Sequence, residues 1–356
     1  MRRIVVKVGT ALLADEKRAI SRKVINNIAS GISQLRKNGF AVVVVSSGAV
    51  GCGMLKMGAV KPADISQAQM LSSIGQPILM DVWMKALEKR GLIASQILCS
   101  ADDFRNRGKF LNLRRTIFRI LNAGVVPVIN ENDSVAVEEI RFGDNDRLSA
   151  LVASHIEADD IVLLTNVEGF FVDGKLVSEI RVIDKVLLEK AGAAGHFGTG
   201  GMRSKLIAAK ITQVSGCRMR IASGREKDVL QKIFLEKKAV GTVILPLKKI
   251  NQRKRWICFG SVCRAEISVD AGAQRAILKG GKSLLAAGIT DVCGECRRGE
   301  TVVITCDRKA FARGIVNYSS AEIRKIAGEN SSRIKEILGY IESEEVIGRD
   351  NLVIEV

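Results

Sequence analysis

The chain has 356 residues, of which 47% are hydrophobic and 26% are charged, with 33 Gly and only 4 Pro. This composition excludes fibrous and disordered proteins, and the length exceeds what one hydrophobic core usually takes, so we expect two globular domains. No apolar run reaches the ~20 residues that a membrane span needs. The first residues lack the apolar stretch of a signal peptide, so we expect a cytoplasmic protein whose eight cysteines are reduced.

The net charge of +17 raises the question whether the chain binds nucleic acid. Residues 251–356 carry 17 Lys+Arg against 14 Asp+Glu, whereas residues 1–250 carry 38 against 24. The excess positive charge therefore lies in the larger part of the chain. An anionic small-molecule substrate explains it as well as a nucleic acid does.

Short β-branched runs alternate with helical stretches in the larger part of the chain. These runs are typical of strands that are buried on both faces of a parallel sheet, and they comprise residues 4–6, 41–45, 125–129 and 161–164. Between the first two runs, Ser21 is expected to cap a helix that ends before Gly39. The alternation predicts an α/β fold, a three-layer αβα sandwich around a mainly parallel sheet.

The pattern changes after Pro246. Residues 248–254 are strongly basic and show no apolar period, which indicates a linker between a domain at 1–247 and a second domain at 255–356. Short β-like runs between glycine-rich turns follow, at residues 266–269, 301–306 and 312–316. We therefore expect a small, mainly β second domain, although residues 319–339 have a helical pattern.

Ligands of open α/β sheets bind beyond the carboxyl ends of the strands, and four expected strand ends carry unusual sequence. They are Lys7-Val8-Gly9-Thr10, Ser46-Ser47-Gly48-Ala49, Asn130-Glu131-Asn132-Asp133 and Thr165-Asn166. Lys7 stands in an apolar strand and needs an anion, because burying an unpaired ammonium is costly; the alternative is a lysine that snorkels at a strand edge. The loop after residue 45 offers backbone amides to an anionic group, and the alternative is a simple turn.

Two acidic, amide-rich segments lie ten residues apart, at 130–133 and 143–146. Together they are suited to bracketing an amino group or a hydrated Mg²⁺, although each alone also fits a solvated turn. A glycine-rich loop at 196–205 leads into a helix-forming stretch, which suits a phosphate contact with Lys205 supplying the charge. Its spacing is that of neither a P-loop nor a dinucleotide-binding fingerprint.

The candidate residues include two lysines but no obvious general base. This set is sufficient if the nucleophile is a substrate carboxylate, which has a pKa of about 4 and is already ionised at neutral pH. Phosphoryl transfer then requires mainly alignment and positive charge against the γ-phosphate oxygens. The residues are therefore compatible with phosphoryl transfer to a substrate carboxylate.

Seven motifs in order along the chain resemble those of the amino acid kinase family, and the resemblance runs through nearly the whole chain. The motifs are VVKVGTALL, VVSSGAVGCG, FLNLRRT, VPVINENDSV, GDNDRLSA, LLTNVEGFF and GTGGMRSKLIAA. Within this family they are most similar to the branch that acts on glutamate. The resemblance implies the amino acid kinase fold and ATP-dependent phosphorylation of the γ-carboxylate of L-glutamate to γ-glutamyl phosphate, the first step of proline biosynthesis, with Mg²⁺ shielding the polyphosphate.

The resemblance also implies roles for individual residues. Lys7 and Lys205 would hold and neutralise the transferred phosphoryl group, while Asp144 and Asp146 would orient these lysines or contact substrate and Mg²⁺. The residues that would bind glutamate are Ser47, Asp133 and Asn145. The residues that would bind ATP are Lys7, Thr165, Asn166, Thr199, Gly200, Gly201, Met202, Arg203, Ser204 and Lys205. Asn166 stands where the family often has Asp, so the nucleotide side would lose a charge.

The C-terminal part is similar to a PUA domain, a small β-barrel module that also occurs in RNA-modifying enzymes, through residues 254–257, 298–300 and 314–318. The resemblance to the amino acid kinase family implies a homodimer or homotetramer, proline as a feedback inhibitor, and glutamyl phosphate reductase as a partner. Two alternatives stay open: an RNA-binding protein that acts through this tail, and a sister kinase that acts on another acid.

No metal site is expected; Cys293 and Cys296 lie near Cys258, Cys263 and Cys306, but their spacing is loose for zinc.

Overall fold

The computed structural model describes residues 1–13, 21–58, 62–135, 145–193, 201–247, 251–259 and 263–354. The chain divides into two compact units, Met1–Lys249 and Ile250–Val356. The division falls inside the segment 248–254 that the sequence predicts to be a linker. None of the helices in the described ranges combines the length and the apolar character needed to cross a bilayer.

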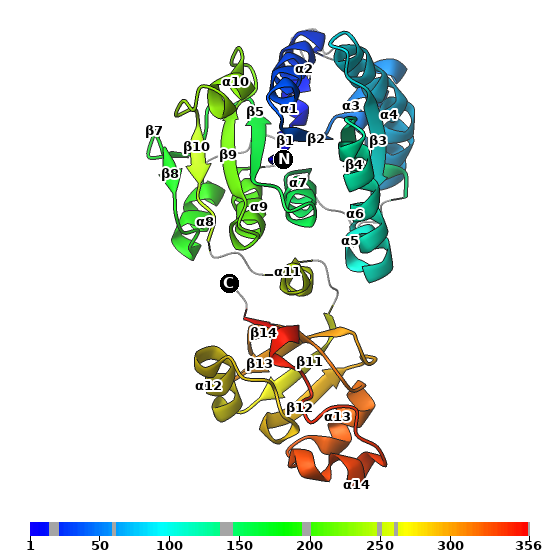
Figure 1. Cartoon of the computed structure of the whole chain (residues 1–356), viewed down its shortest axis with the longest axis vertical. Helices are drawn as coiled ribbons and strands as arrows, with labels where there is room; N and C mark the ends of the chain where they lie inside the picture. Colours follow the sequence, from blue (N-terminus) through cyan, green and yellow to red (C-terminus); the bar gives the residue numbers. More distant parts are fainter. Residues whose placement is uncertain are drawn as a thin grey trace. The chain divides into compact units, whose positions relative to one another are not determined.

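The first unit contains an eight-stranded sheet (Figure 1). In spatial order its strands are β3 (Ala94–Cys99), β4 (Val126–Glu131), β2 (Ala41–Ser46), β1 (Arg3–Val8), β5 (Asp160–Thr165), β9 (Arg218–Ser223), β10 (Thr242–Ile244) and β8 (Glu179–Ile180). All neighbours from β3 to β9 are parallel, and only the β9–β10 pair is antiparallel. The mainly parallel sheet predicted from the β-branched runs is therefore confirmed. A separate small hairpin joins β6 (Phe171–Val172) to β7 (Lys175–Leu176).

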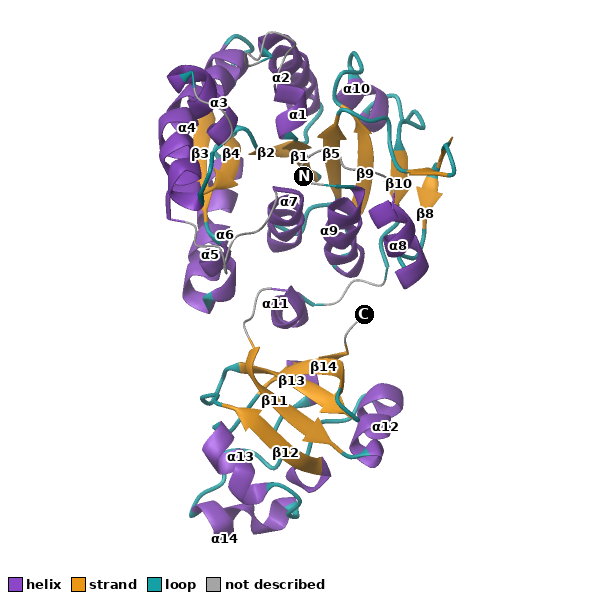
Figure 2. Ribbon diagram, turned by 180° about the vertical axis from the view of Figure 1, so that it is seen from behind, coloured by secondary structure: helices purple, strands orange, loops and turns teal. Residues whose placement is uncertain are grey.

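Helices cover both faces of this sheet (Figure 2). On one face, a shared hydrophobic core joins the strands to α1 (Thr10–Leu13), α2 (Arg22–Lys37), α3 (Ala49–Met57), α4 (Ile65–Glu88) and α10 (Val229–Phe234). The opposite layer contains α5 (Ala101–Arg105), α6 (Arg107–Asn122), α7 (Asn145–His155), α8 (Lys185–Ala193) and α9 (Met202–Val214). The three-layer αβα sandwich expected from the sequence is confirmed.

The helix predicted after Ser21 shows why the local sequence folds as it does. The Ser21 hydroxyl accepts a hydrogen bond from the backbone amide of Val24 and so satisfies one of the first free donors of α2. The apolar stripe is buried against the sheet, and Gly39 follows the helix with a φ of +80°, a value that favours glycine. Both ends of α2 are therefore where the sequence places them.

The second unit contains a five-stranded sheet with the order β12 (Ile289–Gly294), β11 (Cys263–Val269), β13 (Thr301–Cys306), β14 (Lys309–Ile315) and β15 (Leu352–Ile354). Only the β11–β13 pair is parallel. The mainly β second domain is thus confirmed. Its helices are α11 (Gln252–Phe259), α12 (Ala271–Gly280), α13 (Ser320–Ile326) and α14 (Ile334–Leu338), with short 3₁₀ turns η3 (Ala286–Gly288), η4 (Ser331–Arg333) and η5 (Arg349–Asn351).

One feature of the second unit differs from the sequence expectation. Residues 252–254, assigned to a linker because they show no apolar period, form the first turn of α11. The Asn251 side chain accepts a hydrogen bond from the Lys254 amide at 2.8 Å, and Ile257 packs against Ile315 and Val353. A cap and a tertiary contact therefore produce a helix where the sequence shows no apolar period.

Candidate active site

Four neighbouring parallel strands bring the predicted strand-end residues to one edge of the sheet. Their order is β4, β2, β1 and β5, so the ends at Glu131, Ser46, Lys7 and Thr165 follow one another along this edge. The register pairs Val8 with Ser46 on one side and with Leu164 on the other. The sheet order therefore collects into one site four segments that are far apart in the sequence.

Asp146 pairs with both candidate lysines at the centre of this site. It lies in the first turn of α7 and is fully buried, while Lys7 comes from β1 and Lys205 from α9, each 7% exposed. Lys205 Nζ lies 3.0 Å from Oδ2 of Asp146, and Lys7 Nζ forms an ion pair with Oδ1. The Ser204 hydroxyl is 3.3 Å from the same Oδ2. The anion that Lys7 requires is Asp146, and the alternative of a lysine snorkelling at a strand edge is wrong because β1 is a central strand.

The electrostatics of this cluster keep the Asp146 carboxyl ionised. Burial alone would raise the pKa of the Asp146 carboxyl, but the charges and hydrogen bonds of Lys7 and Lys205 outweigh burial and hold the pKa below its usual range. Two ammonium groups thus converge on one carboxylate and leave an excess of positive charge at the end of β1. Such an excess attracts a phosphoryl group.

Ser47 and Asn145 lie in contact next to this cluster. The Asn145 side chain amide Nδ2 donates to the Ser47 hydroxyl at 2.9 Å and to Oδ1 of Asn130 at 2.8 Å. Nδ2 of Asn130 in turn donates to Oε1 of Gln76 on α4 at 2.8 Å. The structure therefore brings together two of the three predicted glutamate-binding residues and links them to α4.

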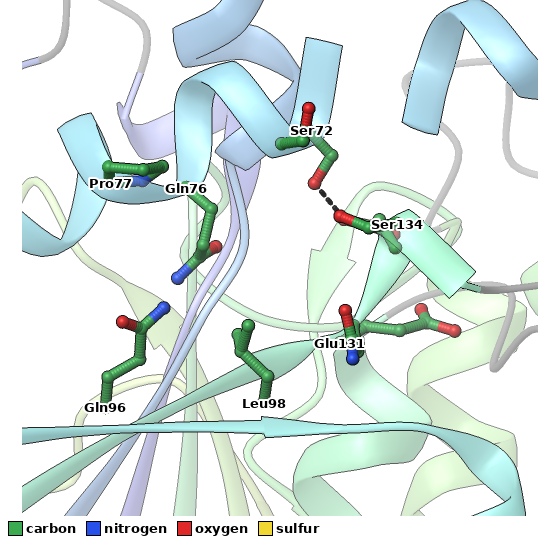
Figure 3. Close-up of a pocket in the computed structure, with 10 residues that line it drawn as sticks. Ser72, Gln76, Pro77, Gln96, Leu98, Glu131 and Ser134 are labelled. Carbon is green, nitrogen blue, oxygen red and sulfur yellow. Dashed lines mark hydrogen bonds between the residues drawn. The ribbon is translucent and has the colours of Figure 1, made fainter. Parts of the chain in front are cut away.

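A pocket of about 210 Å³ adjoins Gln76 (Figure 3). The third predicted glutamate-binding residue, Asp133, is one of its lining residues. Oδ2 of Asp133 accepts a hydrogen bond from the Ser72 hydroxyl at 2.9 Å. The walls of the pocket come from α4, β3, β4 and the segment after β4, and they include Gln76, Gln96 and Glu131. A few polar side chains converge on the pocket, as recognition of a small amino acid requires.

Close backbone contacts fix the wall of this pocket. A Cβ added to Gly53 of α3 would lie 1.9 Å from the carbonyl oxygen of Leu71, and one added to Gly75 of α4 would lie 1.9 Å from that of Ala49. Gly48, which precedes α3, has a φ of +110° that favours glycine. The glycines in the segment after β2 thus serve the docking of α3 onto α4 as well as the loop itself.

The predicted ATP-binding residues are described in part. Thr165 ends β5, and its hydroxyl donates to Oδ1 of the exposed Asn166 at 3.2 Å. Gly201 is the N-cap of α9 and has no side chain with which to bond the first amides of the helix, those of Met202 and Arg203, an arrangement suited to an anion. The predicted residues Thr199, Gly200 and Asp144 lie outside the described residues.

Sequence reasoning did not single out two residues of the site, Ser72 and Gln76. Both lie on the buried face of α4, at helical spacing with Leu79 and Trp83. Polar side chains within an apolar helical stripe are buried and therefore need hydrogen-bond partners, so the sequence of α4 does contain a sign that these two residues have specific partners. Without the fold, however, the partner of neither side chain was evident.

Among the residues that the structure describes, no group of three or more His, Cys, Asp or Glu side chains is placed to hold a metal ion. Cys293 is exposed and Cys296 is buried. Near the site, burial raises the pKa of Cys52 to about 11 and that of Cys99 to about 12. These thiols remain protonated at neutral pH and are unsuited to nucleophilic chemistry.

Comparison with known proteins supports the sequence motifs. Residues 2–223 match the family model "Amino acid kinase family", and residues 265–338 match "PUA domain". The chain is 43% identical over 363 residues to the "Glutamate 5-kinase" of Caldanaerobacter subterraneus subsp. tengcongensis, covering 99% of this chain and 97% of that protein. It is 41% identical over 368 residues to the "Glutamate 5-kinase" of Trichlorobacter lovleyi and 42% identical over 366 residues to that of Thioalkalivibrio sulfidiphilus, with the same coverage.

These matches span both units, so they confirm the resemblance and do not favour the alternative of a protein that acts only through an RNA-binding tail. With a family model over residues 2–223 and relatives that match nearly end to end, the chain belongs to the amino acid kinase family and carries a PUA domain.

Proposed function

We propose that the chain catalyses ATP-dependent phosphorylation of the γ-carboxylate of L-glutamate, giving γ-glutamyl phosphate and ADP. The observation that carries the proposal is the pair of buried ammonium groups of Lys7 and Lys205 on Asp146, directly beside Asn145 and Ser47. The names of the full-length relatives, "Glutamate 5-kinase", support the choice of glutamate.

The two lysines act on the migrating phosphoryl group. The glutamate carboxylate is ionised at neutral pH, so it attacks the γ-phosphorus without a general base. Negative charge on the equatorial oxygens is stabilised by Lys7 from β1 and Lys205 from α9, whose positions are set in advance by Asp146. The residues thus supply alignment and charge, the two requirements of this reaction.

ATP fits the far side of the cluster. The first amides of α9 after Gly201 suit the phosphates, and Thr165 and Asn166 are the expected contacts for the rest of the nucleotide. Mg²⁺ supplies charge shielding of the polyphosphate when it is bound. Both carboxylate oxygens of Asp146 face ammonium groups, so this residue is suited to orienting the lysines and not to holding the cation, which the phosphates of ATP themselves would bind.

Glutamate occupies the side toward α4. Ser47 and Asn145 bind it next to the lysines, and Asp133 recognises its amino group from the adjoining pocket. Family resemblance further supports proline as a feedback inhibitor bound near this site, a homodimer or homotetramer in the cytoplasm, and glutamyl phosphate reductase as the enzyme that receives the product.

The most direct test traps the acyl phosphate with hydroxylamine across a panel of acids. We expect hydroxamate with L-glutamate and ATP, and none above background with L-aspartate, N-acetyl-L-glutamate or glutamate without ATP. Product from another acid in preference to glutamate would identify a sister kinase and reject the glutamate assignment.

A further inference from the structure

A chain of three side-chain amides connects the pocket wall to the phosphoryl-transfer site. Gln76 accepts from Asn130 through Oε1 at 2.8 Å, and Asn130 accepts from Asn145 through Oδ1 at 2.8 Å. All three side chains are buried, with exposed fractions of 9%, 3% and 8%. Asn145 directly precedes Asp146, the carboxylate that holds both lysines.

The direction of this chain determines which end of the Asn145 amide is presented to a ligand. An amide nitrogen donates two hydrogens, and those of Asn145 are directed to Asn130 and to the Ser47 hydroxyl. The Ser46 carbonyl, which only accepts, lies 3.3 Å from the same nitrogen and agrees with this direction. Oδ1 of Asn145 is therefore turned away from these partners, and within the described ranges no side chain or backbone group donates to it.

Gln76 sets this direction from the far end. Its Oε1 requires the nitrogen of Asn130, which leaves the Asn130 oxygen for Asn145. Gly75, the residue before Gln76, touches the backbone of α3, so the start of the Gln76 side chain is fixed. The Gln76 amide extends from α4 toward Gln96 at the pocket (Figure 3). Without the Gln76 acceptor, the Asn130 amide is free to turn its nitrogen toward Asn145, and a hydrogen bond between the two then requires Asn145 to turn its own oxygen toward Asn130.

We infer that Gln76 is a positioning residue for recognition of the acceptor's amino group. By fixing the Asn130 amide, it holds Oδ1 of Asn145 toward the acceptor site, where this carbonyl oxygen accepts a second hydrogen bond from the α-ammonium of the amino acid, in addition to the contact with Asp133. The inference rests on the proposed function and adds a determinant of selectivity for amino acids over simple dicarboxylates. Gln76 acts through Asn130 and Asn145 and does not itself touch the reacting atoms.

The test compares Gln76→Met, which removes the acceptor at similar size, with Gln76→Glu, which keeps an acceptor oxygen. Gln67→Met is the matched control, because Gln67 is an exposed glutamine on the same helix, away from the pocket. For each protein, the KM for L-glutamate is measured together with the Ki of glutarate, the same diacid without the amino group. The ratio of the Ki to the KM isolates ammonium recognition from general effects on folding or charge.

We expect the ratio to fall about tenfold in Gln76→Met, the effect of disturbing one charge-assisted hydrogen bond, through a higher glutamate KM with an unchanged glutarate Ki. The ratio should stay within about twofold of wild type in Gln76→Glu and Gln67→Met. An unchanged ratio in Gln76→Met, equal weakening of both ligands, or a loss in Gln76→Glu as large as in Gln76→Met would overturn the inference. Failure of the proposed function is seen separately, because the wild-type protein would then form no acyl phosphate from glutamate.

Discussion

Lys205 Nζ and Oδ2 of Asp146 are 3.0 Å apart, and the Asp146 carboxylate is fully buried. Because Lys7 pairs with the other oxygen, a single carboxylate fixes the separation of two ammonium groups that come from a strand and a helix. The positive charge is therefore in place before a nucleotide arrives, and no reorganisation is needed during transfer.

Removing either ammonium should slow transfer far more than it weakens glutamate binding. We expect Lys7→Met and Lys205→Met to lower kcat by about 100-fold or more, with a KM for glutamate within about threefold of wild type, because the lysine charge meets charge that develops during transfer. Steady-state kinetics of hydroxamate formation provide the measurement. Lys210→Met, five residues further along α9, is the control and should behave as wild type. A normal kcat in both site variants would remove the assigned roles.

Replacing Asp146 with asparagine should destabilise the first unit by about 3–5 kcal/mol, because it leaves two buried ammonium groups without their anion. The pKa of Asp146 is lowered in the folded state, so its stabilisation is complete above the ordinary carboxyl pKa of about 4 and is lost as the pH falls through the lowered value. Urea unfolding of wild type and Asp146→Asn from pH 7 to pH 3 measures both effects. A difference in the free energy of unfolding that grows toward pH 3 would contradict this account.

Asp133 should affect binding before it affects turnover. We expect Asp133→Asn to raise the KM for glutamate by about 10-fold or more and to change kcat much less, because a carboxylate opposite the ammonium of glutamate contributes mainly to binding. Asp81→Asn, an exposed acid on α4 that pairs with Lys85, is the control and should leave both constants unchanged. If Asp133→Asn has a normal KM, the amino-group contact belongs to another residue.

The crossing of α3 and α4 predicts opposite effects at two glycines of one helix. Gly53→Ala should destabilise by about 1–3 kcal/mol or more, since the added Cβ would meet the Leu71 carbonyl at 1.9 Å. Gly51→Ala meets open space and should stabilise by about 0.5–1 kcal/mol, because alanine loses less entropy than glycine in a helix. Thermal and urea unfolding of both variants tests the pair. Equal effects at Gly51 and Gly53 would show that the contact with α4 is not tight.

Much of the fold could be predicted because the β-branched runs and the capped helix at Ser21 are determined by local sequence. Part of the site could also be predicted. A lysine within an apolar strand, such as Lys7, needs an anionic partner, and parallel strands place their carboxyl ends at the same edge of the sheet. Other features could not be predicted from local pattern. The partner of Gln76 depends on how α4 packs on the sheet, and the helix around Ile257 depends on contacts with β14 and β15. Tertiary packing decides such elements, and one sequence does not display it.

The contact between Gly53 and Gly75 also has a mechanical meaning. The loop before α3, which carries Ser47, and the surface of α4, which carries Ser72 and Gln76, meet without intervening side chains. Two backbones in direct contact cannot slide or separate by small rotamer changes, so these walls move as one rigid body. Any movement of the protein during a catalytic cycle therefore takes place in the other walls of the site, while the wall formed by α3 and α4 stays rigid.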